Sequence, residues 1–103
     1  AVGENHGDRI VGKVLYVDRF GNLVTNIPED ILPQDGEGKT MTVTSGDRRW
    51  DQVPFVPSYG YVKPGALLAT IGSNHFLELS VNHGDAALSL GMQADIEFSV
   101  VFG

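Results

Sequence analysis

Cysteine is absent from the 103 residues of this sequence, which excludes a disulfide framework, thiolate chemistry and cysteine ligation of metals. Apolar runs are short, and none approaches the roughly 20 residues that a membrane-spanning helix requires. The sequence contains no basic-then-apolar signal segment, internal repeat or low-complexity tract. Because the chain begins with Ala1 instead of methionine, we expect it to be a piece of a longer protein.

Positive charge is also scarce, with seven Lys and Arg against thirteen Asp and Glu and a net charge of −6. Such a surface repels phosphate backbones, so a nucleic-acid partner is not expected. The three histidines, His6, His75 and His83, share no close ligand spacing, and we predict no metal site. The length fits one domain with a modest core.

Residues 14–27 form the segment around which we expect the rest of the chain to be arranged. Two apolar stretches flank the polar segment Asp18–Asn22, which predicts a β-hairpin with a polar tip. The tip combines a carboxylate at Asp18, a ring at Phe20 and an amide at Asn22, and Gly21 allows a positive φ beside that amide. Such a tip can hold a flat, polar small molecule. Spacing alone favours the simpler interpretation, in which these are turn residues and Phe20 caps the core.

Short alternating segments dominate the remainder, and no stretch shows sustained helical periodicity. Ala94, Ile96, Phe98, Val100 and Phe102 alternate with polar residues in the clearest of these strands. The pattern predicts an all-β fold of about seven strands, an antiparallel barrel or sandwich. The predicted strands are 10–17, 23–27, 39–45, 48–55, 66–71 (buried on both faces), 76–81 and 94–102.

Two short helical turns are expected between these strands. The first covers 27–32, with Pro28 at its first position, and the second covers 85–90, with Asp85 as N-cap and Gly91 as its end. Residues 1–9 are expected to be a linker or a disordered arm, and 10–103 the folded domain. The proline-rich segment 54–65 should be an ordered loop or edge strand.

Polar loops are predicted at both ends of the strand 76–81. Residues 72–75 precede it, and 82–87 follow it with small residues that permit close backbone approach. Loops of this kind offer N–H and C=O groups to the edge of a ligand. Turn chemistry and a helix cap explain the same residues equally well.

Together, these segments resemble a known family. "GKVLYVDRFGNLVTNI" and "SYGYVKPGALLATIGSNHFLELSVNHGDAALSLGM" are similar to two signatures of the S-adenosylmethionine hydroxide adenosyltransferases, whose superfamily includes fluorinating and chlorinating enzymes. The resemblance runs from about Val11 to Val100. It implies a C-terminal antiparallel β-barrel that follows an N-terminal α/β domain absent from this chain. It also implies a cytoplasmic homotrimer, with the active site between the barrel and the N-terminal domain of a neighbouring subunit.

The resemblance assigns five residues to adenosine binding. Asn22 corresponds to the amide that bonds the adenine edge, and Phe20 to the ring beside it. Tyr59 corresponds to an aromatic position that stacks on adenine. Asn82 and His83 correspond to a loop whose backbone meets the base.

Two further residues correspond to contacts with the methionine part of the substrate. Asp18 matches a carboxylate near the amino group, and Ser73 matches a contact to the carboxylate. The sequence departs from the family at Asn74, where fluorinating members carry a basic residue, and at Asp85, where a small hydroxyl residue is usual. The first departure argues against halogenation.

The implied reaction converts S-adenosylmethionine and water into adenosine and L-methionine without a metal. Methionine leaves the sulfonium as a neutral thioether, so it needs no general acid. No catalytic residue is assigned to this chain, because the resemblance places water activation in the N-terminal domain. We therefore expect the isolated chain to be inactive. The alternative is a free-standing small-molecule-binding or oligomerisation barrel without catalytic activity.

Overall fold

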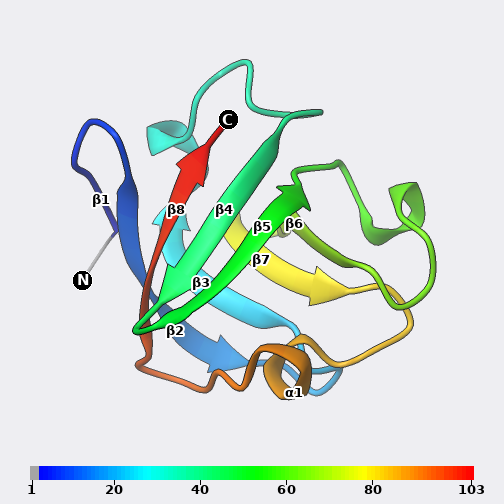
Figure 1. Cartoon of the computed structure of the whole chain (residues 1–103). Helices are drawn as coiled ribbons and strands as arrows, with labels where there is room; N and C mark the ends of the chain where they lie inside the picture. Colours follow the sequence, from blue (N-terminus) through cyan, green and yellow to red (C-terminus); the bar gives the residue numbers. More distant parts are fainter. Residues whose placement is uncertain (1–2) are drawn as a thin grey trace.

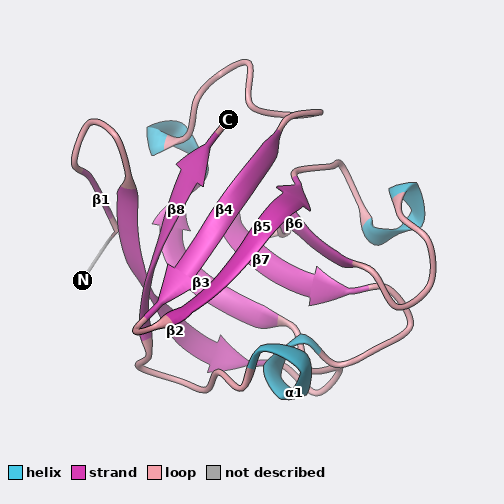
Figure 2. Cartoon of the chain, viewed as in Figure 1, coloured by secondary structure: helices cyan, strands magenta, loops and turns pink. Residues whose placement is uncertain are grey.

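Eight strands and one α-helix form the regular structure of residues 3–103, which the computed structural model describes (Figures 1 and 2). The helix is α1 (Ala86–Leu90), and two 3₁₀ turns cover Glu29–Ile31 and Tyr59–Tyr61. Among these residues, no helix is both long enough and apolar enough to cross a membrane. The strands are β1 (Glu4–Asn5), β2 (Ile10–Val17), β3 (Leu23–Pro28), β4 (Thr40–Ser45), β5 (Arg48–Pro54), β6 (Leu67–Ile71), β7 (Phe76–Val81) and β8 (Glu97–Phe102).

The strands curl into a nearly closed barrel. Seven of them follow the hydrogen-bonded order β5-β4-β8-β2-β3-β7-β6, and every neighbouring pair is antiparallel. The two ends of this order meet where Phe55 bridges Ala69 and the N–H of Val56 donates to the Ala69 carbonyl at 3.0 Å. Figure 1 shows the resulting curvature. The predicted antiparallel barrel is confirmed, and its closure leaves little unpaired strand edge.

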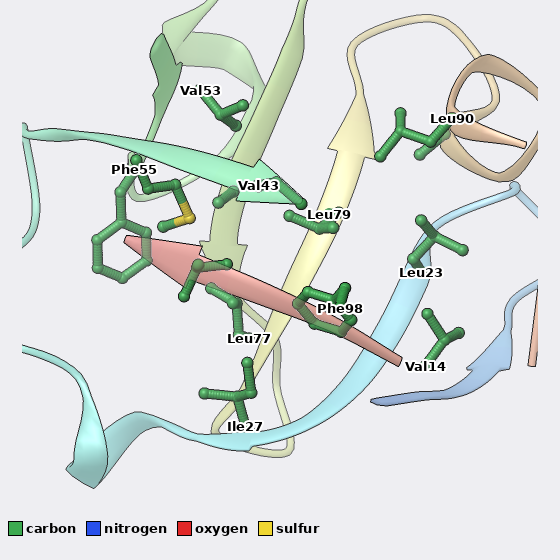
Figure 3. Close-up of a cluster of buried hydrophobic side chains, with 14 of the residues drawn as sticks. Val14, Leu23, Ile27, Val43, Val53, Phe55, Leu77, Leu79, Leu90 and Phe98 are labelled. Carbon is green, nitrogen blue, oxygen red and sulfur yellow. The ribbon is translucent and has the colours of Figure 1, made fainter. Parts of the chain in front are cut away.

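The period-two pattern predicted the core correctly. Met41 and Val43 of β4 and Phe98 and Val100 of β8 are all at most 2% exposed and belong to one cluster, with Ile96 packed at its margin. Figure 3 shows the cluster, with side chains from strands of both halves of the barrel directed inward. Burying each large apolar side chain stabilises the fold by roughly 1.5–3 kcal/mol.

Two strand predictions need correction. The last strand begins at Glu97 instead of residue 94, because Asp95 adopts a positive φ of 71° and Ala94 is exposed in the preceding turn. Strand β6 is not buried on both faces throughout. Leu68 and Ala69 are fully buried, whereas the other three residues are half-buried because β6 lies at one end of the strand order.

Part of the predicted N-terminal arm is paired with the sheet. In β1, Glu4 lies opposite Val11 and Asn5 opposite Ile10, and the N–H of Gly3 donates to the Asn26 carbonyl at 2.8 Å. Residues 3–5 are therefore held against β2 and β3. Residues 1 and 2 lie outside the described part of the chain.

Both predicted helical turns are present. Pro28 precedes the 3₁₀ turn Glu29–Ile31 as its N-cap, one position earlier than expected. At α1, the Asp85 side chain accepts a hydrogen bond from the N–H of Leu88, and Gly91 ends the helix with a left-handed φ of 65°. The segment 54–65 is an ordered connection, and it contains the additional 3₁₀ turn Tyr59–Tyr61.

Candidate functional site

One carboxylate shapes the tip of the β2–β3 hairpin. Asp18 Oδ1 accepts hydrogen bonds from the N–H groups of Phe20 at 2.9 Å and Asn22 at 3.0 Å. Its Oδ2 accepts a hydrogen bond from the side-chain Nδ2 of Asn22 at 2.9 Å. Because only the NH₂ end of an amide donates, this bond fixes the way the Asn22 side chain is turned. Within residues 3–103, Asn22 Oδ1 accepts no hydrogen bond.

The same hydrogen bonds keep Asp18 ionised. Partial burial acts to raise the pKa of Asp18, but the bonds from the Asn22 side chain and from the N–H groups of Asn22 and Phe20 outweigh it. With a smaller contribution from Arg19, they lower the pKa below its ordinary value of 3.8. At neutral pH the carboxylate can therefore only accept hydrogen bonds.

The tip is attached to the start of α1, and Figure 1 shows the two side by side. The N–H of Ala87, which lacks a partner within the helix, donates to the Gly21 carbonyl at 3.0 Å. Gly21 has a φ of +83°, and a β-carbon there would collide with the Asp85 carboxylate. Glycine is thus required both for its backbone conformation and for its small size.

Asn82 fixes the loop that follows β7. Its Nδ2 donates to the Val62 carbonyl at 2.8 Å, and its N–H donates to the Ala66 carbonyl at 3.0 Å. Its own carbonyl accepts from the N–H of Gly65 at 2.7 Å. The next residue, His83, turns the chain with a φ of +56°. Because Asn82 is buried, it braces the loop while His83 faces outward.

These segments surround a surface cavity of about 500 Å³ at the end of β7. Phe20 and Tyr59 stand at its margin with 64% and 61% of their surface exposed. Exposed apolar surface gathered around a hollow is typical of binding sites. The lining residues are Phe20, Asn22, Tyr59, Ser80, Val81, His83 and Gly84.

Ser80 contributes a hydroxyl group to the lining of this cavity. Along β7, Leu77 and Leu79 point into the core, so Glu78 and Ser80 lie on the outer face. Ser80 is only 6% exposed, yet its hydroxyl has no hydrogen-bond partner among the described residues. A ligand in the cavity would supply one.

Glu78 extends the polar surface along the same strand, roughly 6.6 Å from Ser80. In the described chain it makes no hydrogen bond or ion pair. Burial raises the pKa of Glu78, and the charge of Asp18 raises it further. A β-carbon at Gly72 would collide with the Glu78 carboxylate, so this side chain reaches the loop that carries Ser73. We call the outer positions Ser80, Glu78 and Gly72 the β7 strip.

The structure brings together four of the residues predicted from the resemblance. Phe20, Asn22, Tyr59 and His83 line the cavity. Asn82 lies behind the loop and Asp18 behind Asn22, where both act as braces. Ser73 is exposed in the turn at the opposite end of β7.

Sequence reasoning missed the contributions of Ser80, Val81 and Glu78. The alternation of residues 76–81 was the available signal, because it places Glu78 and Ser80 together on the face opposite Leu77 and Leu79.

The described residues contain no group of three His, Asp or Glu side chains that could hold a metal ion. Two His–Glu contacts are present, His75 Nδ1 to Glu29 Oε1 at 3.2 Å and His6 Nε2 to Glu4 Oε1 at 3.3 Å. Both pairs are exposed, and neither lines the cavity. They are therefore not placed to act on a ligand held there.

Residues 12–98 match the family described as the SAM hydroxide adenosyltransferase C-terminal domain. The chain belongs to this family. A curated relative of this adenosyltransferase domain is the (R)-S-adenosyl-L-methionine hydrolase of Thermus thermophilus, which is 39% identical over 82 residues. That match covers 80% of this chain but 28% of the relative, so the chain corresponds to a minor part of that protein.

Solved structures agree with the assignment to the SAM hydroxide adenosyltransferase C-terminal domain. An uncharacterized conserved protein from Thermotoga maritima superposes with a TM-score of 0.88 at 28% identity, over 98% of this chain and 39% of that one. A conserved hypothetical protein from Thermus thermophilus superposes with a TM-score of 0.67 at 32% identity, over 99% and 37% of the two chains.

Proposed function

We propose that this chain is the adenosyl-binding barrel of an enzyme that converts S-adenosylmethionine and water into adenosine and L-methionine. The observation that carries the proposal is the cavity at the end of β7. It presents an oriented amide and two exposed rings at the positions that the family resemblance assigns to adenine.

The chemistry of the cavity suits an adenine ring. After donating one hydrogen to Asp18, the Asn22 amide retains its carbonyl oxygen and one N–H. This acceptor and donor complement the amino group and N7 of adenine, a pairing that asparagine makes with adenine elsewhere. Phe20 and Tyr59 offer faces for stacking, worth roughly 1–3 kcal/mol per base. Backbone groups of the loop at His83 and the hydroxyl of Ser80 complete the polar contacts.

The β7 strip suits the other end of the substrate. Asp18 and Glu78 produce a negative potential there, which favours the ammonium and sulfonium charges of S-adenosylmethionine. Ser73, at the far end of the strip, is in our proposal the contact to the methionine carboxylate. A ligand that extends from the cavity along β7 would meet both groups.

In this proposal the barrel binds and orients the substrate while hydroxide or water attacks the ribose C5′. Orientation alone can remove a large part of a reaction barrier. Water activation falls to an N-terminal α/β domain of a neighbouring subunit, since no His–carboxylate pair of the described residues lines the cavity. The homotrimer, the neighbouring domain and the cytoplasmic location belong to the same proposal and rest on the family resemblance.

The test is to incubate the purified chain with S-adenosylmethionine and to follow adenosine by chromatography. We expect no release from this chain, and release from a longer protein that also carries the N-terminal domain. In the longer protein, Asn22→Ala should weaken adenosine binding about 2- to 12-fold, the loss of one hydrogen bond. Asn5→Ala, which removes an exposed amide far from the cavity, serves as the control.

Two results would contradict the proposal. Adenosine release by this chain alone, abolished by Asn22→Ala, would show that the barrel itself carries the chemistry. Failure of the longer protein both to bind adenosine and to cleave S-adenosylmethionine would favour the alternative, a binding or oligomerisation module without activity.

A further inference from the structure

The Asn22 side chain has two possible orientations, and Asp18 selects one. Its Nδ2 lies 2.9 Å from Asp18 Oδ2. Turning the amide over would place Asn22 Oδ1 at that distance from a carboxylate oxygen, and two acceptors cannot share a hydrogen. The Asp18 carboxylate cannot adjust by rotating, because its Oδ1 is held by the N–H groups of Phe20 and Asn22.

We propose that Asp18 is a positioning residue that turns the Asn22 carbonyl toward the ligand, so that the cavity prefers a 6-aminopurine nucleoside to a 6-oxopurine one. This inference rests on the proposed function, because it assumes that the base occupies the cavity lined by Asn22. It assigns Asp18 a role in base selection, which differs from contact with the methionine amino group.

The selectivity follows from one pair of atoms. Adenosine presents an amino group and N7 along the base edge, and these match the free Oδ1 and remaining N–H of Asn22. Inosine keeps N7 but carries a carbonyl oxygen in place of the amino group. That oxygen would face Asn22 Oδ1, so the bond is lost and two acceptors are opposed. We expect adenosine to bind about tenfold more tightly than inosine.

Asp18→Asn reverses the polarity of this arrangement without changing its shape. The new side chain must direct its carbonyl oxygen at the N–H groups of Phe20 and Asn22. In the unchanged chain these two groups donate their hydrogen bonds to Asp18 Oδ1. Its NH₂ group then occupies the place of Oδ2 and donates, so the Asn22 amide turns over to accept. The N–H groups of Asn22 would then face the ligand and suit a 6-oxo group.

The experiment titrates the ¹⁵N-labelled chain with adenosine and with inosine at millimolar concentration and follows amide resonances by NMR. The unchanged chain should prefer adenosine about tenfold, and Asp18→Asn should abolish or invert that preference. Asp85→Asn is the matched control, because it removes a carboxylate near the tip and asparagine caps a helix equally well. It should keep the adenosine preference. The backbone spectrum of each variant reports whether it is folded.

Each failure has a distinct meaning. If Asp18→Asn is folded and keeps the preference of the unchanged chain, Asp18 does not set the orientation and this inference is wrong. Equal binding of both nucleosides to the unchanged chain also overturns it but leaves the adenosyl site in place. If neither nucleoside shifts any resonance, the same titrations are made on the longer protein that carries the N-terminal domain; absence of binding there as well removes the adenosyl site of the proposed function, and the inference fails with it.

Discussion

Phe98→Ala tests the register on which the barrel depends. Phe98 is 2% exposed on β8, and its cross-strand partner is Gly12, beside which the Ile27 side chain fills the space that a β-carbon would take. Removing a buried phenylalanine costs about 3–5 kcal/mol. Domains of this size are stable by only about 5–15 kcal/mol, so the variant should be close to unfolding.

The measurement is urea and thermal unfolding followed by circular dichroism. For a domain near this size, the loss corresponds to a melting temperature lower by roughly 12–40 °C. Val101→Ala is the matched control, because Val101 lies three residues further along β8 on the outer face and is 43% exposed. It should cost less than about 1 kcal/mol. Equal losses for the two variants would refute the register, even if both remained folded.

The remaining predictions concern the site. Burial, and after it the charge of Asp18, raise the pKa of Glu78. The free energy of unfolding therefore includes a contribution from protonated Glu78 that is fully present below the ordinary pKa of 4.5. This contribution is lost as the pH rises through the raised pKa. Glu78→Gln should therefore increase the free energy of unfolding at pH 7 and leave it unchanged at low pH; a loss at pH 7 would mean that Glu78 has an ionic partner. Gly21→Ala forces a side chain into a left-handed conformation and against Asp85, which should cost about 1–3 kcal/mol in urea unfolding and weaken adenosine binding in NMR titrations. If Gly21→Ala kept both the stability and the adenosine binding of the unchanged chain, the tip would be able to move away from α1.

Local rules predicted most of the strands of this fold and the caps of α1. The alternation around Val43 and Val100 located core strands, and Asp85 and Gly91 marked the ends of α1, because each signal depends on neighbours in sequence. The start of β8 was placed too early because an alternating pattern continues through Asp95, whose backbone conformation the sequence does not reveal. The pairing of β1 was missed because its residues are polar and gain a place in the sheet only through tertiary contact.

The cavity was less accessible to sequence reasoning, because it is assembled from distant segments. Phe20, Tyr59 and His83 come from different connections, and only the family resemblance grouped them. Propensity and alternation say nothing about which loops meet at one end of a barrel. The role of Asp18 was also hidden, since its three hydrogen bonds within the tip depend on side-chain geometry.

The polar side chains of the barrel differ in how completely their hydrogen bonds are satisfied. Inside the barrel, the Thr25 hydroxyl is paired, since it donates to the Leu77 carbonyl at 2.8 Å and accepts from the N–H of Ile27 at 3.2 Å. On the β7 strip, Ser80 and Glu78 have no hydrogen-bond partner among the described residues; Ser80 is 6% exposed and Glu78 is half-buried. Among the described residues, the buried side-chain atoms without a hydrogen-bond partner are Thr70 Oγ1 and Asn82 Oδ1, whereas the polar atoms of the strip remain accessible to water or to a ligand. In the proposed function, a ligand that runs from the cavity along β7 would contact these groups, so the strip and the cavity would act as one surface.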